Sequence, residues 1–160
     1  MSITSNTAPA QVGVQVDVRG PRFAAWVTTA VLVAVLLIAD RSTVGALAVL
    51  AAQAVVFAIG ALAGPRRHPY GQLFARLIAP RLAPTTEREP AAPLRFAQLV
   101  GLAFAVVGVA GFAVAPVVGV IATAFALGAA FLNAAFGICL GCQLYPLVTR
   151  LRRLSDPTPA

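Results

Sequence analysis

The 160-residue chain has few charged residues, two cysteines and one histidine, and its twelve basic residues are all arginine. Charged residues make up 11% of the sequence, whereas soluble domains usually carry about a quarter. This shortage excludes an ordinary cytosolic enzyme and an intrinsically disordered chain. Two cysteines are too few for a disulfide-rich secreted module. Because His68 is the only histidine, a four-ligand metal site would require a dimer or a carboxylate ligand.

Hydrophobic residues are abundant, at 59% of the chain with a mean hydropathy of +0.87. A soluble domain of this size buries only about 70% of its unfolded surface, so the remaining apolar surface must face lipid. The chain is therefore expected to contact a lipid bilayer. Its net charge of +7 would indicate nucleic acid in a soluble protein. Here we expect the arginines to face lipid headgroups, and we expect no nucleic-acid partner.

Uncharged runs predict four membrane-spanning helices. The stretch between Phe96 and Thr149 is too long for one span, and Pro116 is its natural break because proline cannot continue a helix. The fold class is therefore an all-α membrane protein with four transmembrane helices arranged as two hairpins. We expect a flexible tail over residues 1–16, one four-span domain over residues 17–154 and a C-terminal tail over residues 155–160. The predicted spans are residues 23–39, 43–64, 96–113 and 117–140.

The middle segment between the two hairpins predicts a short amphipathic helix. Its apolar side chains recur at helical spacing and Pro80 ends the pattern. We expect this helix to lie in the headgroup region, with a plain loop as the alternative. The apolar face consists of Tyr70, Leu73, Phe74, Leu77 and Ile78.

The arginines predict the orientation of the spans. With four spans, only Arg41 falls on one side, whereas every other arginine falls with the two termini and the middle loop. Positive charge favours the cytoplasmic side. The sequence thus predicts a multi-pass protein of the inner (plasma) membrane with both termini in the cytoplasm.

The two cysteines, Cys139 and Cys142, have the spacing of a CxxC motif. Three roles fit this spacing: a redox or sulfur-carrying dithiol, half of a metal site, or inert packing. We expect the pair at the C-terminal end of the fourth span, where apolar surroundings disfavour a thiolate. Nearby arginines could reverse that effect: Arg150, Arg152 and Arg153, or Arg19 and Arg22. A permanent disulfide is not expected, because the cytoplasm is reducing.

No ionisable residue lies inside a predicted span, which argues against a proton-coupled pump or ion-driven transporter and leaves a neutral pore open. The polar residues there include Gln53, Gln98 and Asn133, and Asn133 is placed to hydrogen-bond between helices. The GxxxG step of Gly137 and Gly141 predicts close helix packing first and a homo-oligomer second. The sequence shows no phosphate-binding loop or other cofactor motif, so we expect no cofactor and no bound metal.

Two segments carry a family resemblance: residues 16–23 (VDVRGPRF) and residues 137–145 (GICLGCQLY). Together they resemble a bacterial integral membrane family named domain of unknown function 4395, over residues 17–150. The resemblance implies a small multi-span protein with Cys-x-Gly-Cys ending its last span. It also implies genomic association with thioredoxin-like and sulfurtransferase proteins, and hence thiol or sulfur chemistry at the cytoplasmic face. Gln143 stands where that family often has an acidic residue.

The leading hypothesis from the sequence is a dithiol that exchanges electrons or sulfur with a cytosolic thioredoxin-like or sulfurtransferase partner. Cys142, nearer the cytoplasm, would be the attacking thiol and Cys139 the resolving thiol. Three residues would orient the partner or shift the pKa of the thiols: Asp17, Arg19 and Arg22. Asn133 is a further accessory residue. Two alternatives remain: a non-enzymatic membrane anchor or subunit, and a conduit for a small sulfur species with its inner gate at the first cysteine. Whether the protein is an enzyme stays open.

Overall fold

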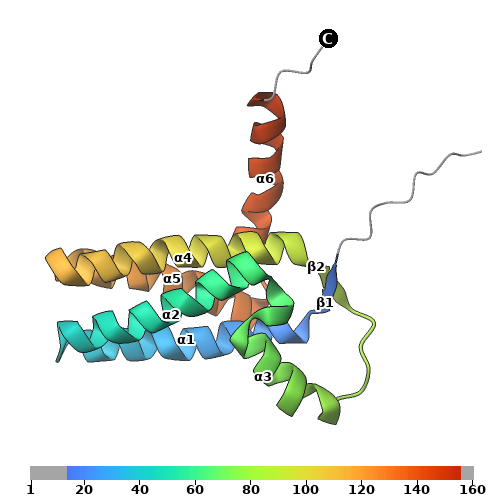
Figure 1. The fold of residues 1–160 in the computed structure, drawn as a ribbon, viewed down its shortest axis with the longest axis horizontal. Coiled ribbons are helices and arrows are strands. Elements are labelled where there is room, and N and C mark those ends of the chain that lie inside the picture. The colour runs from blue at the N-terminus through green and yellow to red at the C-terminus, as the bar shows by residue number, and fades with distance from the viewer. Residues whose placement is uncertain (1–13, 156–160) are drawn as a thin grey trace, which may run out of the picture.

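A computed structural model describes residues 14–155, with side chains described as far as residue 151. Its main body is a bundle of four helices that lie side by side (Figure 1). Each of the four is long and apolar enough to cross a membrane. The predicted fold class is confirmed, and the chain is a multi-pass membrane protein in contact with lipid. The four helices are α1 (Arg19–Ala39), α2 (Thr43–Ala63), α4 (Ala91–Val114) and α5 (Pro116–Phe136).

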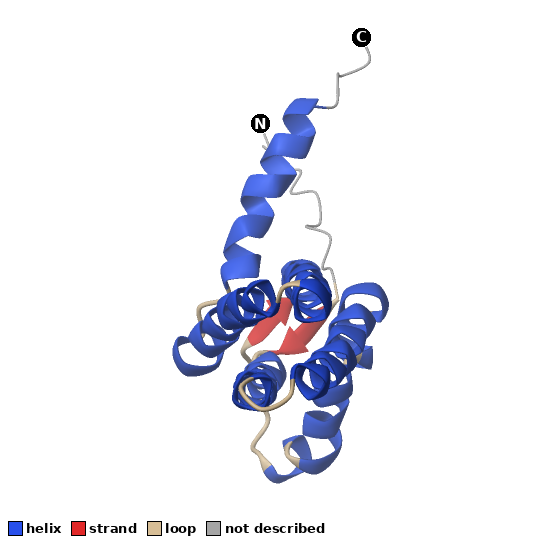
Figure 2. Cartoon of the chain, turned by 90° about the vertical axis from the view of Figure 1, so that its left-hand side faces the viewer, coloured by secondary structure: helices blue, strands red, loops and turns tan. Residues whose placement is uncertain are grey.

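The bundle consists of two helical hairpins. A short turn joins α1 to α2, and the Ser42 hydroxyl begins α2 by accepting a hydrogen bond from the Gly45 N–H at 3.0 Å. Pro116 separates α4 from α5 as predicted, because it is tolerated at the start of a helix but not within one. The hairpins pack with α2 against α4 and α1 against α5, so the helices enclose a common core (Figure 2).

The core is narrow and mostly apolar, with Gln53 and Thr123 as fully buried polar side chains, while much of the helix surface is apolar and exposed. Leu32, Val35 and Leu50 are fully buried at its centre. Large side chains on the outside, such as Leu37 and Val114, remain exposed. Exposed apolar surface of this extent is stable only in contact with lipid.

One end of the bundle carries all of the remaining structure, and we call it the basic end. Here β1 (Gln15–Asp17) pairs antiparallel with β2 (Arg88–Pro90), beside the 3₁₀ turns η1 (Pro65–Arg67) and η2 (Ala79–Arg81). β1 includes two residues of the predicted N-terminal tail. The rest of that tail before residue 14, and the C-terminal tail beyond residue 155, lie outside the described residues.

The predicted amphipathic helix is α3 (Pro69–Leu77). Phe74 is its buried residue, and the Phe74 ring lies 5.8 Å from the ring of Phe23 in α1. Leu73 and Leu77 remain exposed. The Tyr70 hydroxyl donates to Gln53 Oε1 in α2 at 2.7 Å. α3 is therefore fixed to the bundle by Phe74 and Tyr70, with apolar surface left over for the membrane interface.

The predicted bounds of the later spans need correction. α4 begins at Ala91 and so includes Arg95, whose guanidinium donates to the carbonyls of Ala61 and Leu62 at the end of α2. The fourth span ends at Phe136 rather than at residue 140, because Gly137 adopts φ +69° and a left-handed residue ends a helix. A separate helix, α6 (Leu140–Ser155), then begins and points sideways from the bundle (Figures 1 and 2).

Candidate functional site

Cys139 and Cys142 form a disulfide at the start of α6, with their Cα atoms 5.1 Å apart. The Cys139 carbonyl accepts the Gln143 N–H at 3.0 Å, and the Cys139 sulfur accepts the Cys142 N–H at 3.2 Å. Cys139 thus occupies the capping position of α6. The expectation that the pair ends a helix is wrong, because α5 ends at Phe136, three residues before Cys139. The disulfide also differs from the expectation drawn from the sequence, which was that the two cysteines form no permanent disulfide.

The new position reverses the electrostatic effect on the sulfurs. The N-terminus of a helix carries partial positive charge and favours the thiolate form of a reduced cysteine. No acidic residue in the first turn of α6 opposes this effect. Arg22 adds positive charge near Gly137, two residues before Cys139. Its guanidinium carbon lies 3.9 Å from the position that a Cβ added to Gly137 would take. Once reduced, the pair therefore has surroundings that favour a reactive thiolate.

Gly141 fixes the disulfide turn against α4. A Cβ at this position would lie 2.6 Å from the Cα and 2.7 Å from the Cβ of Ala97. Only glycine lets α6 begin this close to another helix. The Tyr145 ring then packs at 6.0 Å from the ring of Phe96. The close packing of α6 against α4 thus explains why a glycine stands between the two cysteines.

Cys139 lies in the wall of a cavity of about 310 Å³, which we call the ring cavity. It is enclosed by α1, α4, α5 and the start of α6. Its wall is mostly apolar, and its polar side chains besides Cys139 are Thr28, Gln98 and Asn133. Among the described residues, Cys142 does not line this cavity. The structure thus brings predicted residues Cys139 and Asn133 to one cavity and leaves Cys142 outside it.

A second cavity, of about 370 Å³, lies at the basic end. The charged or polar part of its wall consists of Gln15, Asp17, Arg66, His68, Arg88 and Gln98. The two cavities adjoin, because Gln98 lies in the wall of both.

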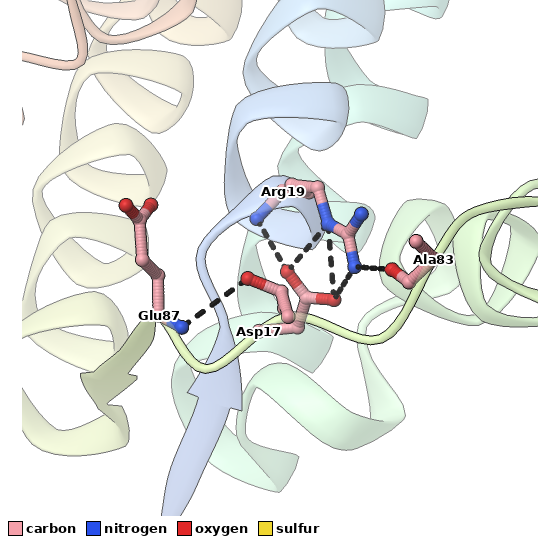
Figure 3. A network of polar contacts seen from close by, with 5 residues as sticks. Asp17, Arg19, Ala83 and Glu87 are labelled. Carbon is pink, nitrogen blue, oxygen red and sulfur yellow. Dashed lines mark hydrogen bonds and ion pairs between the residues drawn. The ribbon is translucent and has the colours of Figure 1, made fainter.

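Asp17 and Arg19 form an ion pair at 3.0 Å where β1 leads into α1 (Figure 3). Arg19 also donates to the carbonyl of Ala83 at 3.1 Å. The hydrogen bond from Arg19 holds the pKa of Asp17 below its usual value. Of the three accessory residues predicted in this segment, only Arg22 approaches the disulfide turn. Asp17 lines the second cavity, and Arg19 is engaged with the loop.

His68 is a candidate site residue that the sequence reasoning missed. It is 4% exposed, and neither ring nitrogen has a hydrogen-bond partner. Beside it, Gln98 Oε1 is also buried without a partner. Burial lowers the pKa of His68 from 6.5 to about 4, which the nearby Gln98 amide partly opposes. The available signal was a single histidine shortly after the Gly64-Pro65 turn that follows α2, but the sequence suggested only a metal-ligand role for it. No cluster of metal ligands occurs in the described part of the chain.

The neutral state of His68 predicts a loss of stability in acid. The unfolded chain binds a proton near pH 6.5 and the folded protein only near pH 4, so the free energy of unfolding should fall as the pH drops through this window. The expected loss is about 1–3 kcal/mol and levels off below pH 4. Thermal unfolding in detergent between pH 7 and pH 4 measures it. In His68→Gln the slope of this window should flatten, and an unchanged slope would contradict the assignment.

Comparison with known proteins identifies the family. The family model described as "Domain of unknown function (DUF4395)" matches residues 16–150. This range runs from β1 through the four spans to the disulfide turn and most of α6. A comparison with curated proteins gives no match, and neither does one with solved structures. The chain therefore belongs to the DUF4395 family.

Proposed function

We propose that this protein is a thiol–disulfide relay in which the Cys139–Cys142 pair exchanges electrons with a thioredoxin-like dithiol protein. The observation that carries the proposal is the CxxC disulfide at the start of α6, where a helix N-terminus faces the sulfurs. Structural disulfides seldom combine this spacing with this position, whereas reactive pairs use both to stabilise a thiolate. The position of Arg22 beside the same turn further supports the proposal.

The exchange balances with the two cysteines alone. A partner thiolate attacks the Cys142 sulfur, the Cys139–Cys142 bond breaks, and Cys139 leaves as a thiolate. The second partner thiolate then attacks the partner's own sulfur and releases Cys142. The partner becomes a disulfide, and two electrons and two protons are left on the Cys139/Cys142 pair. Cys142 is assigned to the partner because Cys139 lines the ring cavity and Cys142 does not.

The leaving group determines much of the rate in such exchanges. A thiol that is stable as a thiolate leaves faster. Cys139 has the better surroundings for this role, since its sulfur accepts the Cys142 N–H. Arg22 supports the thiolate, while Asp17 and Arg19 hold β1 in place at the basic end.

The proposal places the basic end in the cytoplasm of a bacterial inner membrane. Among the described arginines, only Arg41 lies at the opposite end. α6 has exposed Leu144 and Leu147 beside Arg150, which is the composition of a helix that lies on a membrane surface. A partner would then meet the disulfide at the membrane surface.

The orientation is tested with single cysteines introduced into a Cys139→Ser/Cys142→Ser background. A cysteine at Ser42 should react with an impermeant maleimide from the periplasmic side of intact cells, and one at Thr86 should react only after the membrane is opened. The expected contrast is complete, because arginine asymmetry fixes the orientation of a whole protein. The reverse pattern would overturn the cytoplasmic assignment.

The relay itself is tested with the oxidised protein in lipid nanodiscs and reduced thioredoxin as the probe. Thioredoxin should become oxidised with one protein disulfide lost per thioredoxin disulfide formed, as read by maleimide mass shift. A matched sample with the Cys139→Ser/Cys142→Ser protein should leave thioredoxin reduced. If dithiothreitol opens the disulfide but thioredoxin does not exchange with it, the proposal is wrong.

A further inference from the structure

The ring cavity adjoins an apolar groove on the lipid-facing side of the bundle. This groove, of about 480 Å³, lies between α4 and α5 and is lined only by apolar side chains. It shares Val100, Phe104 and Phe125 with the ring cavity. The rings of Phe104 and Phe125 stack at 6.3 Å where the two spaces meet. A ligand with an apolar tail in the groove could therefore extend a head group toward Cys139.

The polar atoms of the ring cavity are few and suit a ring with oxygen substituents. Ligand pockets of this size combine apolar walls with a few fixed polar groups. Gln98 lies in the wall of the ring cavity, and its buried Oε1, which stands beside His68, makes no hydrogen bond, although such an oxygen normally accepts one. Asn133 supplies a second amide to the same wall. Amide groups can donate to a carbonyl oxygen and accept from a hydroxyl.

The relay chemistry requires a second redox partner. Each exchange with a dithiol protein leaves two electrons and two protons on the cysteine pair, which must be removed before the next exchange. The apolar spaces beside Cys139 admit a lipid-soluble carrier better than a soluble one. Quinones are the two-electron carriers that membrane disulfide-forming systems use.

We infer that the ring cavity binds the head group of a polyprenyl quinone, with its tail in the α4–α5 groove, and that this quinone reoxidises the Cys139/Cys142 dithiol. The inference rests on the proposed function. The two S–H bonds break, the Cys139–Cys142 bond forms, and the quinone takes up two electrons and two protons to become a quinol. No other reactant is needed. Cys142 then serves the protein partner and Cys139 serves the quinone.

The test uses the reduced protein in quinone-free nanodiscs, without oxygen, and decylubiquinone as the probe. Its fully substituted ring does not add to thiols, so loss of thiols reports oxidation. We expect one quinone to become quinol for every two thiols lost, measured by quinone absorbance and maleimide mass shift. The Cys139→Ser/Cys142→Ser protein should consume none.

The position of the site is tested with two variants and a matched control. Ala129→Phe fills the ring cavity, and Ala124→Phe makes the same change on the exposed face of α5. Only Ala129→Phe should slow oxidation by decylubiquinone, by about tenfold or more, while exchange with thioredoxin persists. Gln98→Leu should weaken quinone affinity several-fold and provides a second test if the filled cavity does not fold. Equal rates in all variants would overturn the site.

The outcomes separate this inference from the proposed function. If thioredoxin exchanges with the disulfide but decylubiquinone leaves both thiols intact, the quinone inference fails and the relay stands; the cavity then holds only lipid chains. If the quinone oxidises the dithiol but thioredoxin never exchanges, the quinone site stands and the proposed partner is wrong.

Discussion

The Cys139→Ser variant should form a stable mixed disulfide through Cys142 with a thioredoxin that keeps only its attacking cysteine and is supplied as its thionitrobenzoate disulfide, and its turnover with intact thioredoxin should fall by at least about 100-fold. Cys142 remains available at the start of α6, so its thiolate attacks the thioredoxin sulfur and thionitrobenzoate leaves. The adduct then persists because neither Cys139 nor a second thioredoxin thiol is present to attack it. Non-reducing electrophoresis and mass spectrometry of the linked peptides identify the bond.

The Cys142→Ser variant is the control for this assignment. Its remaining thiol, Cys139, lies in the wall of the ring cavity and should form little adduct. Both variants should lose turnover, since either change removes the disulfide. If Cys142→Ser trapped thioredoxin as efficiently as Cys139→Ser, the division of roles between the two cysteines would be wrong.

Gly141→Val should displace the start of α6 and destabilise the protein by about 3 kcal/mol, at the upper end of overpacking costs. The added Cβ would stand 2.6 Å from the Cα of Ala97, and a backbone atom cannot rotate away. The disulfide turn must then move away from α4. Thioredoxin exchange should slow by about tenfold or more, measured beside thermal unfolding in detergent.

Gly128→Val provides the matched change on α5. No atom lies within 4 Å of a Cβ built on Gly128, so valine fits there without a clash. Its stability should change by less than about 1 kcal/mol and its exchange rate should not change. Equal losses in the two variants would show that Gly141 has no special packing role.

The four spans could be predicted because each rests on an apolar run and a break. Pro116 separates α4 from α5 in the sequence as it does in the structure. The spacing around Phe74 likewise predicted α3. These features depend on local composition and periodicity, which a single sequence displays directly.

The surroundings of the cysteines could not be predicted, because they depend on where one helix ends. Gly137 stands within an uncharged run and resembles a packing glycine of a longer span, yet its left-handed conformation ends α5. α6 also includes Pro146, although proline is disfavoured inside a helix. The placement of Arg22 and the burial of His68 arise from contacts between distant segments, which no local pattern encodes.

The redox state of Cys139 and Cys142 in native membranes tests the central claim most directly. Membranes are treated with a permeant maleimide before and after mild reduction, and the added mass is measured on the whole chain. If the pair is reactive, two more maleimides are added to each chain after reduction. Neither cysteine is labelled when the membranes are first treated with an oxidant. Two thiols that never become labelled, or that stay labelled without a disulfide under oxidant, would contradict the account.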